Sequence, residues 1–538
     1  MTATRLHHDS VFLHELPLRQ ADRRPDQVAL KYADQRLSYA GLQASIDGLA
    51  AGLAAIGLQR GERLAIYLEK RPETVIASFG ATAAGLAFVP INPLLKSEQV
   101  SFILRDCDVK VLVTTPGRLA LLHATLASCP ALRHIVLTDE PEPMAAFTGV
   151  NLLRWGQLLD AQPVSGPRLI DSDIAAILYT SGSTGQPKGV VLSHRNLVAG
   201  AKSVASYLQN RPDDILLAAL PLSFDAGFSQ LTTAFHSGAS VVLLNYLLPR
   251  DVLHAIEREH VTGLTGVPPL FIQLAQLRWP AAAHQHLRYF ANTGGRMPRE
   301  TLSLLRQQLP AAKPYLMYGL TEAFRSTYLP PEEVDRRPDS IGKAIPNAEI
   351  LVLREDGSAC AVDEPGELVH RGPLVASGYW NDAEKTAERF KLLPQAARPG
   401  GLQLPEYAVF SGDTVRRDSE GFLYFIGRRD EMMKTSGYRV SPTEVEEVLY
   451  ATRLVGECVA FGVDHPTLGQ VIQVIATAPA GESRIDLEAL QSQCRQLMPA
   501  YMLPAGIELQ PGPLPRNPNG KIDRKLLSGQ WAERQATR

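Results

Sequence analysis

Apolar runs of strand length alternate with stretches of helical periodicity along the first two thirds of the chain. The early runs are 28–32, 63–68, 87–90 and 109–114, and the helical stretches lie at 38–57, 72–85 and 99–106. Further apolar runs follow at 215–220, 240–244 and 263–267. Strands that alternate with helices favour a parallel sheet with helices on both faces. We therefore predict an α/β fold with doubly wound sheets.

The pattern changes twice toward the C-terminus. From residue 349 short alternating strands with Gly and Asp turns predict a β-rich subdomain at about 345–429. From residue 437 the pattern predicts a small α+β domain of helix, strand, strand, helix and strand, at 442–450, 457–462, 471–477, 486–497 and 506–509. The charged run 427–431 separates the β-rich pattern from the α+β pattern. The expected domains are a large N-terminal one, 1–429, and a small C-terminal one, 430–538.

Composition narrows the class of protein. A chain of 538 residues is too long for one ordinary core, and a net charge of −2 gives no reason to expect nucleic acid or a membrane as a partner. The five cysteines are scattered and odd in number, which argues against a disulfide framework. The start has no apolar signal region, and the apolar runs are too short to cross a bilayer, so we expect a cytoplasmic protein. Residues 139–172 have little pattern, and we expect them to loop over the surface.

The stretch 179–190 is the strongest local signal. Three glycines, four Ser or Thr residues and Lys188 follow the apolar run 174–178, and Ser193 can cap a helix that begins after it. Glycines let the backbone approach a ligand, while N–H groups, hydroxyls and a lysine suit phosphate oxygens. No Gly-Lys-Ser/Thr closes the loop, so it is not a Walker A motif. A flexible linker is the alternative interpretation.

Several motifs together resemble the AMP-forming adenylation superfamily of acyl-CoA synthetases, nonribosomal-peptide adenylation domains and luciferases. They occur in the family's order: 179–190, Tyr318-Gly-Leu-Thr-Glu322, Ser411-Gly-Asp413, Gly427-Arg-Arg-Asp430, Lys434-Thr-Ser-Gly437 and Asn517-Pro-Asn-Gly-Lys521. The resemblance implies adenylation of a carboxylate with Mg-ATP. A thiol of CoA or of a carrier protein's phosphopantetheine then displaces AMP. It also implies that the small C-terminal domain is mobile and that the protein is a monomer or homodimer.

The resemblance also assigns roles around the nucleotide. Glu322 would bind Mg²⁺ and Thr321 the α-phosphate, while Asp413 would accept the ribose hydroxyls and Arg428 would reach the ribose or phosphate. A helix-start glutamate, a turn aspartate and a solvated surface arginine are the plain alternatives. The polyphosphate loop would be Thr180, Ser181, Gly182, Ser183, Thr184, Gly185 and Lys188, and the adenine site Gly295, Arg296, Met297, Tyr318 and Gly319.

Lys521 is the residue that we expect to carry adenylation, because a lysine can bridge the substrate carboxylate and the α-phosphate. Asp430 matches the family's hinge. Rotation there would present Lys521 first and then the strand with Lys434, Gly437 and Arg439, beside the tunnel for the pantetheine thiol.

The sequence is less informative about the carboxylate. At Phe224 and Asp225 this chain has the Phe-Asp of amino-acid-activating domains, in which the aspartate binds the substrate ammonium. A helix cap by Asp225 or Ser223 is the alternative. Arg325 could face an acidic group or form an ordinary salt bridge. The expected pocket is small and partly polar, with Phe224, Asp225, Ala226, Ser229, Asn292, Gly294, Met317, Arg325 and Ser326.

Two subgroups share the local texture around residues 223–235 and 318–328. One contains free-standing ligases that load proline-like amino acids, and the other contains exosortase-associated acyl-CoA ligases. We expect a small amino acid or a similar acid as substrate, with CoA or a separate carrier protein as acceptor. A synthetase for a non-amino short or medium acyl acid is the main alternative. A non-catalytic nucleotide-binding relative and a luciferase-like oxidase are remote ones.

Overall fold

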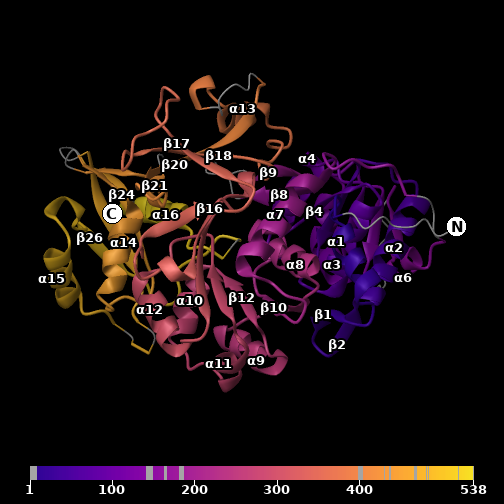
Figure 1. Ribbon diagram of the computed structural model, residues 1–538, viewed down its shortest axis with the longest axis horizontal. Coiled ribbons are helices and arrows are strands. Elements are labelled where there is room, and N and C mark those ends of the chain that lie inside the picture. The colour runs from indigo at the N-terminus through magenta and orange to yellow at the C-terminus, as the bar shows by residue number, and fades with distance from the viewer. Residues whose placement is uncertain are drawn as a thin grey trace.

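The computed structural model describes residues 9–140, 149–162, 166–180, 187–397, 404–428, 431–435, 438–465, 469–479, 481–482, 484–518 and 520–536. Figure 1 shows two large sheets joined by helices, with the small C-terminal domain at the end of the long axis opposite the N-terminus. The mixed α/β class predicted from the alternating pattern is confirmed.

A seven-stranded sheet forms the first part of the chain. Its order is β7 (Asn151–Arg154), β6 (His134–Leu137), β5 (Val111–Thr114), β3 (Arg63–Tyr67), β4 (Ala87–Pro90), β8 (Ile174–Thr180) and β9 (Lys188–Ser193). Neighbouring strands are parallel except β8 and β9. Its crossover helices are α2 (Tyr39–Ala55), α3 (Pro72–Ala83), α4 (Ser97–Asp106), α5 (Pro116–Leu126) and α6 (Trp155–Leu159).

A larger sheet, fourteen-stranded within the described residues, forms the second part. Its parallel half contains β1 (Val28–Tyr32), β11 (Ser240–Leu243), β10 (Ile215–Ala218), β12 (Gly263–Gly266), β13 (Tyr289–Asn292) and β14 (Lys313–Tyr318), with β2 (Gln35–Ser38) antiparallel at the edge. The accompanying helices are α1 (Glu15–Arg23), α7 (His194–Leu208), α8 (Asp225–Ser237), α9 (Pro249–Glu259), α10 (Pro268–Ala275), α11 (Ala281–His286) and α12 (Arg299–Gln308).

The β-rich segment extends the same sheet with antiparallel strands. From β14 the order continues through β15 (Thr327–Leu329), β16 (Ser340–Ala344), β21 (Leu423–Arg428), β20 (Tyr407–Arg417), β18 (Gly366–Arg371) and β17 (Glu349–Leu353). Strand β19 (Phe390–Leu392) pairs with β20, and α13 (Ala383–Arg389) precedes it. The change of texture near residue 345 therefore does not interrupt the hydrogen-bonded path. Short 3₁₀ turns are η1 (Thr321–Ala323), η2 (Pro331–Glu333), η3 (Gln395–Ala397) and, further on, η4 (Ala500–Met502).

The C-terminal part folds around its own five-stranded sheet and core. Its strands are β23 (Tyr438–Val440), β22 (Met433–Thr435), β25 (Gly469–Ala476), β24 (Cys458–His465) and β26 (Gly506–Leu509), and its helices are α14 (Pro442–Ala451), α15 (Leu487–Leu497) and α16 (Arg524–Ala536). The domain boundary predicted at residues 429–430 lies outside the described residues, and its position stays a prediction.

The two large sheets share one core because helices from both pack between them. Phe79 of α3 stacks on Phe228 of α8 at 5.8 Å between ring centroids and meets Phe235 edge-on at 5.3 Å. All three rings are fully buried. This aromatic junction joins α3, which covers the first sheet, to α8, which begins at Asp225.

The structure departs from the sequence prediction at three places. A strand, β9, lies between the glycine-rich loop and the helix that Ser193 caps, so the loop joins the two strands of an antiparallel pair. Residues 139–172 include β7 and α6 in addition to loop. Beyond residue 521 the chain forms α16, for which we made no prediction. The capping of α7 by Ser193 is confirmed, since Ser193 Oγ accepts from the Asn196 N–H.

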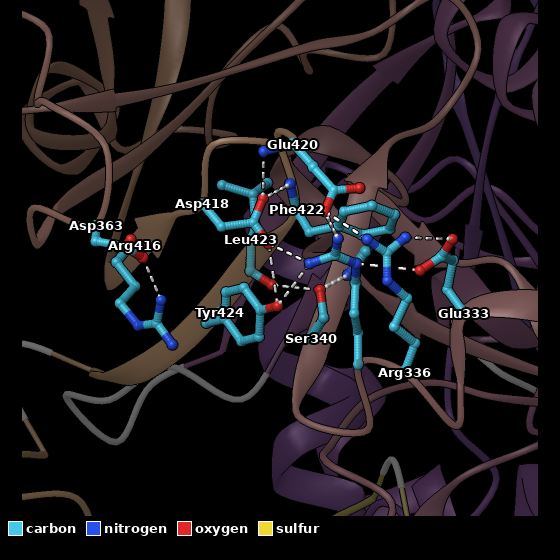
Figure 2. Close-up of polar contacts among 12 residues, drawn as sticks. Glu333, Arg336, Ser340, Asp363, Arg416, Asp418, Glu420, Phe422, Leu423 and Tyr424 are labelled. Atoms are coloured by element: carbon cyan, nitrogen blue, oxygen red, sulfur yellow. Dashed lines mark hydrogen bonds and ion pairs between the residues drawn. The ribbon is translucent and has the colours of Figure 1, made fainter.

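An ion-pair network joins η2 and the segment before β16 to the turn between β20 and β21 (Figure 2). The guanidinium of Arg337 contacts the carboxylates of Glu333, Asp418 and Glu420 and lies 4.2 Å from the ring centroid of Phe422. Arg337 is buried, whereas the side chain of Arg336 is 59% exposed. Arg337 therefore pairs with all three carboxylates, whereas the exposed Arg336 pairs only with Glu333 and Glu420.

We predict that Arg337→Met lowers the melting temperature, because three neighbouring carboxylates lose their shared cation and repel one another. Arg336→Met is the matched control and should melt close to wild type, since exposed pairs contribute little. Both variants would be measured by differential scanning calorimetry. Equal melting temperatures for the two variants would contradict a central role for Arg337.

Candidate active site

The base of the glycine-rich loop is held from two sides. Thr180 at the end of β8 pairs in register with Lys188 at the start of β9. Tyr179 donates its hydroxyl to the carboxylate of Asp106, and Trp380 Nε1 donates to the Asp106 carbonyl at 2.8 Å. The loop residues Ser181, Gly182, Ser183, Thr184 and Gly185 lie outside the described part of the chain.

Lys188 and Glu322 both contact the side chain of Tyr379. Lys188 Nζ lies 5.3 Å from the ring centroid of Tyr379, and the Tyr379 hydroxyl donates to Glu322 Oε1 at 2.6 Å. Desolvation lowers the pKa of Lys188, and the nearby cations Lys385 and Arg389 lower it further. The three cations make this corner suited to a polyanion.

The sequence interpretation missed Tyr379, Lys385 and Arg389. Lys385 and Arg389 are four residues apart on α13, a spacing that places two cations on one helix face. That spacing was the available signal, but nothing in the sequence brings α13 to Lys188. Tyr379 stands 57 residues from Glu322, and only the fold joins them.

Asp413 is the acceptor at the expected ribose position. Its carboxylate receives a hydrogen bond from the Tyr318 hydroxyl, and its Oδ1 lies 3.2 Å from Arg428 Nε. Oδ1 is buried and accepts no hydrogen bond from the described residues. The contact with Arg428 is therefore an ion pair and not a hydrogen bond. Burial raises the pKa of Asp413, and Arg428 and Tyr318 oppose that rise. The free lone pairs of Oδ1 could accept hydroxyl donors from a sugar.

The remaining nucleotide residues lie on two neighbouring turns. Thr321 is buried in η1 beside Glu322, and the turn closes with a hydrogen bond of 2.9 Å from the Ser326 N–H to the Tyr318 carbonyl. Gly319 packs so closely that a Cβ there would lie 2.7 Å from the Cα of Arg325. On the other turn Gly295 and Arg296 are exposed, and Met297 is buried.

Lys521 reaches this site from the C-terminal part of the chain. A Cβ on Gly294 would lie 2.9 Å from Lys521 Cε and 3.6 Å from Nζ, so the lysine side chain lies against that glycine. Burial lowers the pKa of Lys521, and the carboxylates of Asp225, Asp413 and Glu431 raise it while Arg428 opposes them. The structure therefore brings Lys521 together with residues from both parts of the site.

Three polar contacts hold the C-terminal part in this orientation. Asn92 Nδ2 donates to the Pro518 carbonyl at 2.6 Å, three residues before Lys521. Glu447 on α14 accepts from the Arg299 N–H at 3.1 Å and lies 3.6 Å from Arg296 Nε. Arg453 and Glu300 form a third contact at 2.8 Å.

The predicted substrate residues surround the start of α8 and the ends of β13 and β14. Phe224 and Asp225 are buried, and Asp225 Oδ1 accepts no hydrogen bond. Asn292 donates to the Gly295 carbonyl at 2.8 Å, while its Oδ1 is buried without a donor. The side chains of the others are also occupied or packed: Ser229 pairs with Thr233, Met317 accepts from Tyr207, and Ser326 pairs with His370.

A small cavity of about 10 Å³ adjoins these residues. Ala226, Ser229, Met317 and Arg325 all line it, so four residues of the predicted pocket face one space. The sequence also raised helix capping by Asp225 or Ser223. Neither Asp225 Oδ1 nor Ser223 Oγ, both buried, has a hydrogen-bond partner, and no side chain caps α8.

The predicted thiol and hinge residues are not described in full. Asp430 and Gly437 lie outside the described residues. Lys434 and Arg439 pair across β22 and β23 by their backbones, and their side chains fall outside the described part. Their roles stay predictions.

Known proteins resemble this chain over nearly its whole length. The profile of the AMP-binding enzyme family matches residues 18–380, and that of the AMP-binding enzyme C-terminal domain matches residues 444–521. The chain is 31% identical over 503 residues to L-proline–[L-prolyl-carrier protein] ligase of Streptomyces coelicolor, with 91% of both chains covered. The crystal structure of the anthranilate CoA ligase AuaEII with anthranoyl-AMP superposes with a TM-score of 0.85 at 25% identity, covering 98% of this chain and 99% of that one.

Larger assemblies also contain a similar segment. Tyrocidine synthase 3 of Brevibacillus parabrevis is 29% identical over 520 residues, which is 96% of this chain. The chain spans only 8% of the length of that synthase.

We predict that Gly294→Ala lowers the rate of the reaction that uses Lys521 by about 10²-fold. This is the scale expected when a catalytic side chain is displaced by roughly 1 Å. The added methyl would displace Lys521, and the backbone φ of +77° at this position disfavours an L-residue. Gly421→Ala, at a φ of +85° with no atom closer than 4.0 Å, is the matched control for the backbone effect. ATP–pyrophosphate exchange measures the result, and equal activity of both variants would contradict the contact.

Proposed function

This chain belongs to the AMP-binding enzyme family, and on that premise we propose that it is an AMP-forming ligase for a small amino acid or a similar acid. One observation supports the proposal most directly: the side chain of Lys521 lies against Gly294 and interacts electrostatically with Asp225, and both residues belong to the predicted pocket. A mobile cation and a buried carboxylate then face the same bound acid. The acyl group would pass to the thiol of CoA or of a carrier protein's phosphopantetheine.

ATP would be held by groups already positioned. Lys188, with Lys385 and Arg389 nearby, would hold the β- and γ-phosphates, and Asp413 would accept the ribose hydroxyls. The Tyr318 hydroxyl orients Asp413 by donating to it. Asp413 and Lys188 each contact a neighbouring tyrosine, and contacts of this kind reduce the entropy that a side chain loses when a ligand binds.

The donor set fits a single Mg²⁺ that is bound largely through phosphates. Among the described residues no group of three or more His, Cys, Asp or Glu side chains could hold a metal ion. Mg²⁺ commonly takes one or two carboxylates together with phosphate oxygens and water. Glu322 would supply that carboxylate, and the bound ion would neutralise charge on the phosphates.

In the first half-reaction the substrate carboxylate would attack the α-phosphorus as the bond to pyrophosphate breaks. Lys521 would hold the carboxylate against the phosphate and neutralise charge there, with Thr321 at the same phosphate. In the second half-reaction the thiol sulfur would attack the acyl carbonyl, and AMP would leave as the C–O bond breaks. The thiol proton would pass to solvent.

Asp225 supports an amino acid as substrate. The residue is 7% exposed, and its Oδ1 has no hydrogen-bond donor. Burial raises its pKa, while the charges of Arg325 and Lys521 and the Ala226 N–H oppose that rise. A buried carboxylate oxygen without a donor is unfavourable, and a donor that reaches it is favoured. An ammonium group on the substrate would supply the missing donors.

No helix in the described part of the chain has the length and apolar character needed to cross a membrane. A cytoplasmic location and a monomeric or homodimeric state stay predictions from the sequence.

We predict that Lys521→Ala lowers carboxylate-dependent ATP–pyrophosphate exchange by about 10²–10³-fold, because one stabilising cation is lost from the reacting phosphate. The variant should still convert preformed acyl-AMP to thioester. Lys525→Ala, on the exposed part of α16, is the control. Undiminished exchange in Lys521→Ala would contradict the assignment.

We predict that Asp225→Asn raises the KM for an amino acid about 10²-fold, as expected for breaking a buried ion pair. In the wild type only ionised Asp225 binds ammonium, and its pKa is raised. The kcat/KM for the amino acid should therefore fall as pH falls through that raised pKa, and the variant should lose this dependence. Exchange measured across pH with amino acids and the matching non-amino acids would test it. A wild type that activates only non-amino acids would contradict the amino-acid proposal.

A further inference from the structure

Arg325 is a buried cation that forms no ion pair with any residue that the structure describes. The residue is 2% exposed, and its Nη1 donates to the Thr293 hydroxyl while its guanidinium carbon lies 5.6 Å from the Phe324 ring centroid. Its Nε is buried without a hydrogen-bond partner, and no carboxylate of the described residues lies within 4.0 Å. The sequence left a surface or structural salt bridge open for this arginine. Its burial excludes the first, and the described residues contain no partner for the second.

The backbone holds Arg325 in an unusual conformation. Its φ of +51° is left-handed, which disfavours a non-glycine residue. Gly319 packs against its Cα, and the Ser326 N–H closes the turn onto the Tyr318 carbonyl. Strain of this kind persists where surrounding contacts fix it, and it gathers at functional sites.

The space beside Arg325 is small and partly polar. Arg325 lines the cavity of about 10 Å³ together with Ser229, Gln230, Thr233 and Thr265. The Gln230 carbonyl oxygen is also buried without a donor. A group that enters this space without hydrogen-bonding capacity would leave these polar side chains unpaired, and a group that can pair them is favoured.

Mutual neutralisation with Asp225 does not account for Arg325. The two charges influence each other, but they form no ion pair within 4.0 Å and share no hydrogen bond. A structural pair would join Asp225 Oδ1 to the guanidinium, yet both Oδ1 and Arg325 Nε are without partners. The pocket thus presents two separate, opposite charges.

Three charged side chains therefore lie near one another, since Asp225 interacts electrostatically with both Arg325 and Lys521. In the proposed function Lys521 faces the reacting carboxylate and Asp225 the ammonium. We propose that Arg325 binds a second carboxylate, so that the substrate is an amino acid with a short acidic side chain of the aspartate or glutamate type. This inference rests on the proposed function and assigns the third charge of the same site.

The first experiment measures ATP–pyrophosphate exchange by the wild-type full chain with five amino acids and one acid without an ammonium group. The substrates are aspartate, glutamate, asparagine, glutamine, alanine and succinate. We expect kcat/KM for aspartate or for glutamate to be about 10²-fold higher than kcat/KM for the corresponding amide and for alanine. The reason is that only a side-chain carboxylate neutralises the buried guanidinium.

The second experiment uses Arg325→Met, which keeps an unbranched side chain at the left-handed position and removes the charge. We expect the ratio of kcat/KM for the acidic amino acid to kcat/KM for its amide to fall by about 10²-fold. Arg168→Met, at an exposed position, is the matched control. Thermal shift with ATP monitors the nucleotide site of each variant.

The outcomes separate the two proposals. The Arg325 inference would be overturned if the wild type preferred amino acids with neutral side chains, or if Arg325→Met kept the wild-type preference for the acidic amino acid. The proposed function would stand in both cases. Activity with succinate but with no amino acid would overturn both the amino-acid proposal and this inference. If Arg325→Met does not fold, the wild-type preference for acid over isosteric amide decides the inference, and Arg325→Lys should keep that preference in part.

Discussion

The contact between Lys521 and Gly294 joins two separately packed parts of the chain into one site. The C-terminal part has its own sheet and core, and the pocket belongs to the two large sheets. The lysine enters only because Gly294 has no side chain and because Asn92 and Glu447 hold the incoming loop and helix. The chemistry proposed for the reacting phosphate depends on this docking, whereas the nucleotide groups lie wholly on the large part.

Most of the fold could be predicted because the hydrophobic pattern repeats a simple unit. Parallel strands buried on both faces read as short apolar runs, and the helices between them show their periodicity. Strand β9 was missed because it follows a loop longer than the usual hairpin connection, so no local turn signal pairs it with β8. Helix α16 was missed because we made no prediction beyond Lys521.

The site could be predicted where a role is written in a local motif. Glu322, Asp413 and Lys521 each stand in a short recognisable run, and the fold brings all three toward one region. Tyr379 and the cations of α13 have no such motif, and they reach Lys188 only through tertiary packing. Arg325 shows the limit most clearly. Its sequence context is the same whether it is a surface residue or a buried one. Only the fold reveals that it is buried and that no carboxylate of the described residues pairs with it.

The ion pair between Arg296 and Glu447 has a thermodynamic consequence. Arg296 belongs to the turn that we expect to contact adenine, and Glu447 belongs to the C-terminal helix α14. Nucleotide binding and docking of the C-terminal part therefore share a structural element, and each must favour the other by the same free energy. The nucleotide site would then bind AMP less tightly when the C-terminal part is undocked. Departure of the spent nucleotide would then be coupled to the rotation that the family resemblance implies for the C-terminal part, which would give the two half-reactions a fixed order.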